Sequence, residues 1–383
     1  MATGTSGLRG TLTNILNLGI KELRSLKGDP LMLAFIVWAF TGGIYAVGSA
    51  VSMELHNAPV AVVDEDQSPL SHRLVDALQP PRFKVPERIG LADMDPGMDQ
   101  GRYTFVLDIP PHYQRDLNAG RAPLIQLNID ATQMSQAFIG AGYIQTIVNN
   151  EVGGYLRHNR PAEPLPAGLT TRMRFNPNLD SAWFGSVMEI VNQITLLSII
   201  LAGAALIRER EHGTLEHLLV MPLTPFEIMS AKVWANGLVV LAATGLSLQF
   251  VVKGVLGVPI SGSLALFLCG TALHLFSTTA MGIFLATVAR SMPQMGLLLI
   301  LAIVPLQILS GATTPRESMP ELVQTLMLAA PTTHFVAFAQ AILYRGAGLD
   351  VVWPQFLAIA LIGTVFFLAA LARFRKTVAA MQG

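Results

Sequence analysis

The segment 208–217 holds the densest group of side chains that could do chemistry. It reads Arg-Glu-Arg-Glu-His-Gly-Thr-Leu-Glu-His and lies between two apolar stretches. His212, Glu216 and His217 approach the zinc-binding pattern H-x-x-E-H, but three residues instead of two separate the first histidine from the glutamate. Histidines five positions apart lie on different faces of a helix, so they could not share one zinc ion. We therefore predict no metal site in this segment.

Other catalytic patterns are also missing from the sequence. No G-x-x-x-x-G-K-[ST] loop occurs, so the chain has no phosphate cradle of its own. The acidic run Asp64-Glu65-Asp66 lacks the glycine and the spaced ligands of a calcium loop, and we interpret it as a solvated turn. The single cysteine, Cys269, cannot form an intrachain disulfide. We expect no catalytic residue and no cofactor in this chain.

Polar side chains inside apolar stretches are the remaining candidates. Glu189, Asn192 and Gln193 stand at positions i, i+3 and i+4, so they share one face of a helix, and His274 lies within another apolar stretch. Ionisable residues at such depth usually face a bundle interior or a water-filled path. Two interpretations stay open: these four residues line a substrate path, or they form hydrogen bonds that hold helices together.

The composition explains why these residues must sit in a membrane. Hydrophobic residues make up 52% of the 383 residues and charged residues 13%, whereas soluble domains carry about 25% charged residues. Lys+Arg and Asp+Glu balance at 25 each, which gives no basic excess for binding nucleic acid. About 20 helical residues cross a bilayer. Six stretches are long and apolar enough, although Pro305 interrupts the fifth: 31–53, 183–207, 233–252, 264–289, 294–314 and 352–372.

The fold class predicted is therefore an α-helical polytopic membrane protein with six transmembrane helices and an inserted α/β extracytoplasmic domain. Residues 1–30 form an amphipathic N-terminal helix, because Leu12, Leu16 and Ile20 recur at helical spacing opposite Lys21 and Arg24. The first transmembrane helix follows at 31–53, the extracytoplasmic domain at 54–180, and five further transmembrane helices at 181–383. A coupling segment at 208–232 and two outer helices at 315–350 interrupt the last part.

Basic residues set the orientation of the spans. Lys and Arg concentrate in the short segments on one side of the membrane, which places both termini in the cytoplasm. The residues on that side are Arg9, Lys21, Arg24, Lys27, Arg208, Arg210, Lys232, Arg290, Arg373, Arg375 and Lys376, against Lys253, Arg316 and Arg345 on the other.

The inserted segment alternates strand and helix signals. We predict strands at 59–63, 103–109 and 124–129, and helices at 68–78, 110–118 and 133–158. Ser68 is the expected cap of the first helix and Pro69 its first residue. The proline-rich stretch 161–177 is the expected linker back to the membrane.

With this layout the chain resembles permease subunits of type-2 ABC exporters whose first extracytoplasmic loop is a folded domain. The resemblance covers nearly the whole chain and is most specific at the coupling segment. It rests on four pieces: Lys21-Glu-Leu to Lys27-Gly-Asp-Pro30; Val60-Ala-Val-Val-Asp64-Glu-Asp-Gln-Ser68; Arg208 to Glu216 followed by Pro222-Leu-Thr-Pro225 and Lys232; and Pro331-Thr-Thr-His-Phe335 through Arg345-Gly-Ala-Gly348.

The resemblance implies partners and a mechanism. ATP and Mg would be bound by a separate ATP-binding subunit, and the segment 209–220 would sit in a cleft of that ATPase. The coupling residues are then Glu209, Arg210, Glu211, Gly213, Thr214, Glu216 and Leu219. A second permease copy or a paralogue would complete a dimer within the membrane lipids, and a periplasmic adaptor could contact the outside domain. The implied activity is efflux of hydrophobic or amphipathic compounds, such as drugs or lipid-like molecules, across the inner membrane.

The alternative is a non-transporting membrane receptor or assembly factor that uses the outside domain as a ligand sensor. Against it, sensors usually carry a sizeable cytoplasmic output module, and no predicted cytoplasmic segment exceeds about thirty residues. The sequence does not disclose the substrate.

Overall fold

A computed structural model describes residues 8–50, 55, 57–130, 134–159, 181–213 and 221–382. The chain divides into two compact units, one formed by Met1–Val51 with Ala182–Gly383 and the other by Ser52–Ser181. The first unit is helical and the second combines a sheet with helices. Each unit is described by itself below.

The helical unit begins with two helices that meet at a sharp corner. α1 (Leu8–Lys27) exposes Leu12 and Leu16 on one side, as its amphipathic pattern predicts. Asp29 caps α2 (Pro30–Trp38), because its side chain accepts the backbone N–H of Met32 at 3.1 Å, and Pro30 is the first residue of that helix. The π-helix η1 (Ala39–Gly43) and α3 (Ile44–Ala50) continue the same rod.

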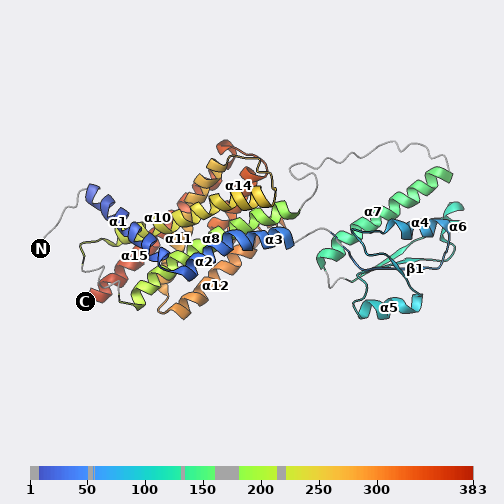
Figure 1. The fold of residues 1–383 in the computed structure, drawn as a ribbon, viewed down its shortest axis with the longest axis horizontal. Helices are drawn as coiled ribbons and strands as arrows, with labels where there is room; N and C mark the ends of the chain where they lie inside the picture. The colour runs from blue at the N-terminus through green and yellow to red at the C-terminus, as the bar shows by residue number, and fades with distance from the viewer. Residues whose placement is uncertain are drawn as a thin grey trace. The chain divides into compact units, whose positions relative to one another are not determined.

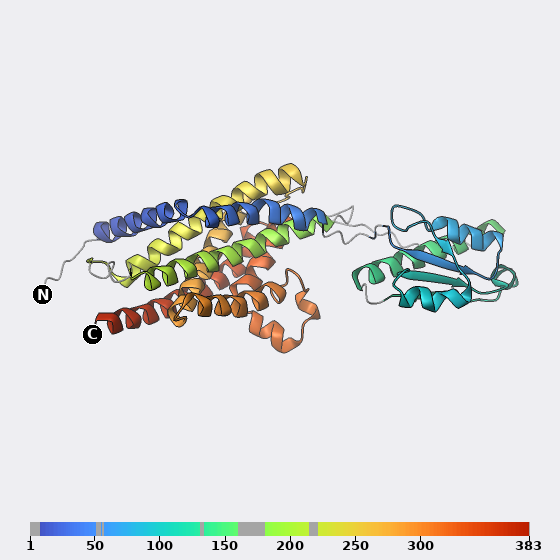
Figure 2. The same ribbon diagram turned by 60° about the horizontal axis from the view of Figure 1, so that its bottom comes forward.

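The remaining helices of this unit follow the second unit in the chain. They are α8 (Ser181–Glu211), α10 (Pro225–Ser247) with its π-helical extension η2 (Leu248–Val255), α11 (Leu264–Val288), α12 (Met292–Ile308), the 3₁₀ turn η3 (Arg316–Ser318), α13 (Glu321–Met327), α14 (Pro331–Leu343) and α15 (Leu349–Gln382). α11 packs against α10, α14 and α15. The start of α1 and the end of α15 lie at the same end of the unit in both views (Figures 1 and 2).

Five helical stretches among the described residues are long and apolar enough to cross a membrane. They are Pro30–Ser49, Trp183–Glu211, Pro225–Val255, Leu264–Val288 and Leu349–Lys376. Leucine, isoleucine and valine side chains are exposed along their outer faces, which suits contact with lipid. The protein is therefore a polytopic membrane protein.

The predicted fifth span is shorter than expected. α12 has 17 residues and ends at Ile308, because Pro305 removes one backbone donor and Gly311 then takes a left-handed conformation at φ +97°. The helices expected in 315–350 are present as α13 and α14. They meet at 88° and together are long and apolar enough for a broken span or a re-entrant loop. Counted as one span, they bring the candidate spans among the described residues to six.

A hydrogen bond links the two rods of this unit that contain π-helical turns. η1 interrupts the rod that starts with α2, and η2 ends the rod that starts with α10. The hydroxyl of Ser247, just before η2, donates to the backbone carbonyl of Phe40 in η1 at 2.6 Å. A π turn leaves carbonyl groups without their usual helical donors. The hydroxyl of Ser247 on one rod thus supplies a hydrogen-bond donor to a backbone carbonyl of the other rod.

The second unit contains a four-stranded mixed sheet in the order β2-β1-β3-β4. β1 (Val60–Asp64) pairs in parallel with β2 (Glu87–Arg88) and β3 (Phe105–Ile109), and β4 (Gln126–Ile129) pairs antiparallel with β3. The helices are α4 (Pro69–Ala77), α5 (Leu91–Asp99), α6 (Tyr113–Asn118) and α7 (Met134–Asn159). Sequence analysis did not predict β2 or α5. β2 has only two residues, and Pro96 lies inside α5, where proline usually argues against a helix.

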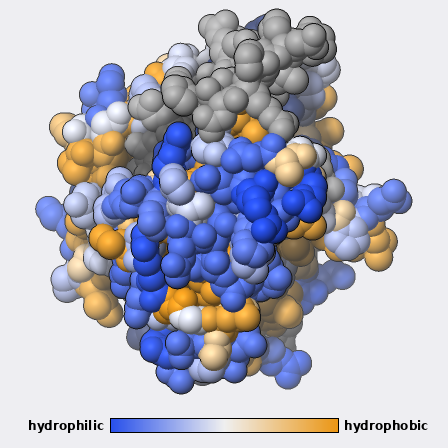
Figure 3. Space-filling view, turned by 90° about the vertical axis from the view of Figure 1, so that its right-hand side faces the viewer, coloured by the Kyte–Doolittle hydropathy of each residue, from blue (hydrophilic) through white to orange (hydrophobic). Residues whose placement is uncertain are grey.

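Apolar side chains from both faces of the sheet are buried. Val60, Val62, Phe105 and Leu107 contact residues of α4 and α7 in one cluster, and Ala61, Val63 and Val106 belong to a second. The face of this unit shown in Figure 3 is mainly hydrophilic with a small hydrophobic patch, unlike the apolar outer faces of the membrane helices.

The acidic run after β1 is a structural turn, as predicted. Asp64 accepts hydrogen bonds from the backbone of Gln67 and the hydroxyl of Ser71, and Asp66 accepts one from the backbone of Gln114. Ser68 caps α4 in a reciprocal capping box with Ser71, also as predicted. Nowhere in the described residues do three or more histidine, cysteine or acidic side chains gather as a metal site would require.

Candidate functional site

The last turn of α8 carries four consecutive charged residues, Arg208, Glu209, Arg210 and Glu211, which we call the charged turn. Successive residues of an α-helix are rotated by about 100°, so four of them spread over most of the helix circumference. Gly213 follows in a left-handed conformation at φ +67°, which ends the helix. The charged turn can therefore reach several neighbouring helices at once.

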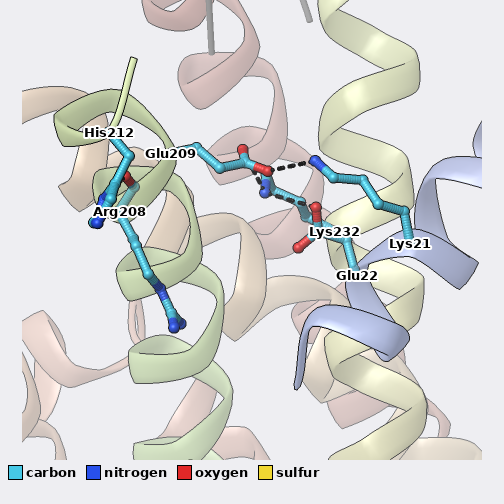
Figure 4. Close-up of polar contacts among 6 residues, drawn as sticks. All are labelled: Lys21, Glu22, Arg208, Glu209, His212 and Lys232. Atoms are coloured by element: carbon cyan, nitrogen blue, oxygen red, sulfur yellow. Dashed lines mark hydrogen bonds and ion pairs between the residues drawn. The ribbon is translucent and has the colours of Figure 1, made fainter. Parts of the chain in front are cut away.

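Glu209 is the centre of an ion-pair network that joins three helices (Figure 4). Its Oε2 lies 2.8 Å from Nζ of Lys232 on α10, and its Oε1 lies 3.1 Å from Nζ of Lys21 on α1. Lys232 also contacts Glu22 of α1 at 3.0 Å. The side chain of Lys232 is 2% exposed, so this ammonium group is buried between two carboxylates. Such a cation is tolerated only because both partners are in place.

Arg208 connects α8 to the corner between α1 and α2. Its Nη1 lies 2.9 Å from Oδ2 of Asp29, the residue that caps α2. The backbone N–H of Met32 and the nearby guanidinium of Arg208 both hold the pKa of Asp29 below its ordinary value. The carboxylate thus stabilises the first turn of α2 and the contact with α8 together.

The other two charged side chains bind helix ends. The guanidinium of Arg210 donates to the backbone carbonyls of Ala286 and Ala289 at the end of α11, where a cation is favoured by the helix dipole. Oε1 of Glu211 accepts the backbone N–H of Met292, the first residue of α12, at 2.7 Å. An anion at a helix N-terminus is favoured for the same reason.

Arg208 to Glu211 thus tie α8 to α1, α2, α10, α11 and α12. Sequence analysis predicted that Glu209, Arg210 and Glu211 couple the chain to an ATPase, and this stays a prediction. The structure shows that their side chains contact neighbouring helices of the same chain. It also ends the expected segment 208–232 earlier, because Pro225–Ser247 is the helix α10 and Lys232 lies in its second turn. Of the other predicted coupling residues, Gly213 follows the charged turn, while Thr214, Glu216 and Leu219 lie outside the described residues, as does His217.

The start of α10 is fixed by its own cap. The hydroxyl of Thr224 accepts the backbone N–H of Glu227, and the carboxylate of Glu227 accepts the backbone N–H of Thr224. Glu227 also accepts a hydrogen bond from the side chain of Asn14 on α1 at 3.1 Å. The start of α10 is therefore held both by its own cap and by a contact with α1.

The polar residues predicted along a substrate path separate into two groups. Nε2 of Gln193 donates to Oε1 of Glu189 at 2.5 Å, and both side chains, like that of Asn192, are half-buried on one face of α8. His274 is fully buried elsewhere. Its Nε2 lies 2.9 Å from the hydroxyl of Thr195, and its ring stacks on Phe335 at a centroid distance of 4.0 Å. The structure does not bring His274 together with the other three.

Sequence reasoning missed three members of the network, namely Lys21, Glu22 and Lys232, as partners of the charged turn. The available signal was Lys232 itself, since a lysine close to the start of an apolar stretch needs an anionic partner when buried. The sequence could not identify that partner, because Glu209 and Lys21 are 188 positions apart.

Comparison with known proteins agrees with this architecture. Residues 30–372 match the family model described as ABC-2 family transporter protein. The chain is 62% identical to the inner membrane transport permease YhhJ of Escherichia coli K12, over 97% of this chain and 99% of that protein. It is 28% identical to the probable multidrug ABC transporter permease YbhR of the same organism, over 94% and 97% of the two chains. The chain belongs to the ABC-2 family of transporter proteins.

Proposed function

We propose that this chain is the membrane-spanning permease subunit of an ATP-driven exporter in the inner membrane, powered by a separate ATP-binding subunit. The observation that carries the proposal is the charged turn, because it connects the end of α8, next to the predicted coupling residues, to five helices of the bundle. The family and the names of the relatives, which include an inner membrane permease and a probable multidrug permease, support the same function.

In this proposal the ATP-binding subunit contacts the segment between Gly213 and the cap at Thr224. Thr214, Glu216 and Leu219 supply the docking contacts, whereas Glu209, Arg210 and Glu211 act behind them. When ATP binding moves this segment, the end of α8 moves with it. The buried ion pairs and helix-end contacts then carry α1, α10, α11 and α12 along, because a buried lysine cannot lose its partners without a large cost.

The orientation follows from the same segment. A soluble ATPase works in the cytoplasm, so the end of the bundle that holds the charged turn faces the cytoplasm. The start of α1 and the end of α15 lie at that end as well (Figures 1 and 2), which supports a cytoplasmic position for both termini. The α/β unit is then extracytoplasmic, and its hydrophilic face is suited to water and to a periplasmic adaptor.

A second permease copy completes the transporter. α12 exposes a continuous apolar face of Leu297, Ile300, Leu301, Val304 and Ile308, which is available to a partner within the membrane. The half-buried face of Glu189, Asn192 and Gln193 is the best candidate for a cargo path, with amphipathic or cationic hydrophobic compounds as the cargo.

Co-purification with an ATP-binding chain tests the proposal. Wild type should retain that chain in stoichiometric amount and show ATPase activity that responds to cargo. Glu216→Ala should weaken retention, whereas Glu209→Gln should keep retention but reduce ATP-dependent export, because it acts behind the docking surface. Glu321→Gln, at the start of α13, serves as a control that changes neither. Intact permease that never retains an ATP-binding chain would refute the proposal.

A further inference from the structure

A cavity of about 280 Å³ lies beside the charged turn, between α1, α8 and α10. Its walls come from α1 (Lys21, Glu22, Ser25, Leu26), from α8 (Leu201, Ala205, Arg208, Glu209) with His212, and from α10 (Asn236). The cavity is far larger than the ~30 Å³ share of one water molecule. It is therefore large enough to hold part of an organic ligand.

The lining changes from polar to apolar along α8. His212, Arg208 and Glu209 lie at one end, and Ala205 and Leu201 follow on successive turns toward the membrane interior. Residues 201 and 212 are separated by about 16 Å along a helix that rises 1.5 Å per residue. A ligand that fills this space must be polar at its outer end and largely apolar at its inner end.

One buried polar group in the wall has no partner. Asn236 is 7% exposed, and its side-chain amide nitrogen has no hydrogen-bond partner among the described residues. It lies one turn after Lys232 on the same face of α10, so it is deeper in the bundle than the ion-pair network. A buried amide N–H without an acceptor costs about 1–3 kcal/mol in general. A ligand carbonyl at this depth would supply that acceptor.

The accessible charge at the outer end is positive. Lys21 and Arg208 are 47% and 42% exposed, whereas the carboxyl side chains of Glu22 and Glu209 are 12% and 13% exposed and both bind the buried Lys232. Glu209 also binds Nζ of Lys21, but an ammonium group has three N–H donors. Of the guanidinium nitrogens of Arg208, Nη1 is the one that contacts Asp29. A guanidinium group has five N–H donors, so others can bind an anion. The mouth of the cavity therefore favours an anion such as a phosphate.

We propose that this cavity binds an anionic phospholipid of the surrounding leaflet. Its phosphate contacts Lys21 and Arg208, an ester carbonyl accepts the amide N–H of Asn236, and the upper part of an acyl chain lies against Leu26, Leu201 and Ala205. The amphipathic helix α1 exposes Leu12 and Leu16 to the same membrane surface, and basic pockets between membrane helices are known to take lipid headgroups. The bound lipid joins α1 to α8 and α10.

The site makes a specific prediction for lipid retention. The full-length permease is purified in mild detergent, exchanged with phosphatidylglycerol or phosphatidylcholine, and examined by native mass spectrometry during stepwise delipidation. We expect about one phosphatidylglycerol per chain to be retained at least ten-fold more strongly than phosphatidylcholine. Asn236→Leu removes the donor and Ala205→Phe fills the cavity, so both should lower the retention of phosphatidylglycerol.

Gln249→Leu provides the matched control, because it removes an exposed amide from the same α10–η2 rod and should leave retention unchanged. Gel filtration of each variant verifies that it is folded. Equal retention of the two lipids by wild type, or undiminished phosphatidylglycerol retention by folded Asn236→Leu, would overturn the proposal. The readout does not involve ATP or transport, so the result is independent of the exporter function proposed above.

Discussion

The ammonium group of Lys232 lies 2.8 Å from the carboxylate of Glu209, although lysine and glutamate belong to different membrane helices. Lys232 is almost completely buried and also contacts Glu22, so one cation connects α10 to α8 and α1. These ion pairs resist disruption, because removing one charge leaves the remaining charges buried without a partner and so raises the free energy of the folded state.

Replacing this lysine should therefore destabilise the protein strongly. We expect Lys232→Met to lower the free energy of unfolding by about 3–5 kcal/mol, the usual cost of breaking a buried pair. Thermal unfolding in detergent measures the change. Lys21→Gln is the matched control, since Lys21 is 47% exposed and exposed pairs contribute about 1 kcal/mol or less. A loss for Lys21→Gln as large as for Lys232→Met would contradict the buried-cation interpretation.

The contact between Glu211 and the start of α12 should depend on charge as well as on hydrogen bonding. Glu211→Gln keeps an acceptor for the backbone N–H of Met292 but loses the favourable interaction with the helix dipole, worth up to about 1 kcal/mol. Glu211→Ala loses both. Hydrogen exchange of the first turn of α12 should accelerate in the order wild type, Gln, Ala. If the two variants exchange at the wild-type rate, the carboxylate does not hold this helix.

Gly19 on α1 is required for close packing against Trp234 on α10. A methyl group at position 19 would overlap the indole ring, whose N–H donates to the carbonyl of Ile15 at 3.1 Å. We expect Gly19→Ala to lower the melting temperature and the double variant Gly19→Ala/Trp234→Ala to recover part of the loss. Gly142→Ala, at a helical glycine with open space around it, should have little effect. No rescue in the double variant would mean that the two residues act separately.

Acid should weaken the corner between α1 and α2. The pKa of Asp29 is depressed in the folded state, mainly by the backbone N–H of Met32 and then by Arg208, so its stabilising contribution is present above the ordinary pKa near 4. That contribution disappears as the pH falls through the lower folded-state value. Asp29→Asn should therefore be less stable than wild type at pH 7 and approach wild type below about pH 4. A difference in melting temperature that stays constant with pH would argue against this origin.

The polar face of α8 predicts selectivity for cargo charge. Glu189→Gln preserves shape and the possibility of a contact with Gln193, but removes a negative charge within the membrane. Export of cationic compounds should fall while export of neutral ones and the melting temperature stay unchanged. Gln193→Leu separates the hydrogen bond from the charge and should affect both classes of cargo equally. Unaltered cation export by Glu189→Gln would remove this face from the proposed path.

The sequence predicted those features that depend on neighbouring residues. Apolar length located the spans, and Ser68-Pro69 located the start of α4. Prediction failed where local rules conflict. Sequence analysis missed α5 because that helix contains a proline. It placed the end of the fifth span six residues too late, because Pro305 and Gly311 together end α12 at Ile308. The charge pattern at residues 208–211 was noticed, but its contacts with neighbouring helices were not predicted. Whether a charged turn faces solvent or its own bundle depends on partners such as Lys21 and Met292, which are distant in sequence.

The paired π turns have a consequence for the rotational phase of the N-terminal helices. A π turn contains one residue more than the α-helical turn it replaces. If all five residues of Ala39–Gly43 were α-helical instead, the extra residue would add one further step of about 100°, and everything before it would rotate by that angle relative to α3. Asp29 would then turn away from Arg208, and α1 would carry Lys21 and Glu22 away from Glu209 and Lys232. The π turn of η1 thus absorbs one residue without rotating the preceding helices, and the ion pairs at one end of the bundle depend on this backbone irregularity in the middle of another helix.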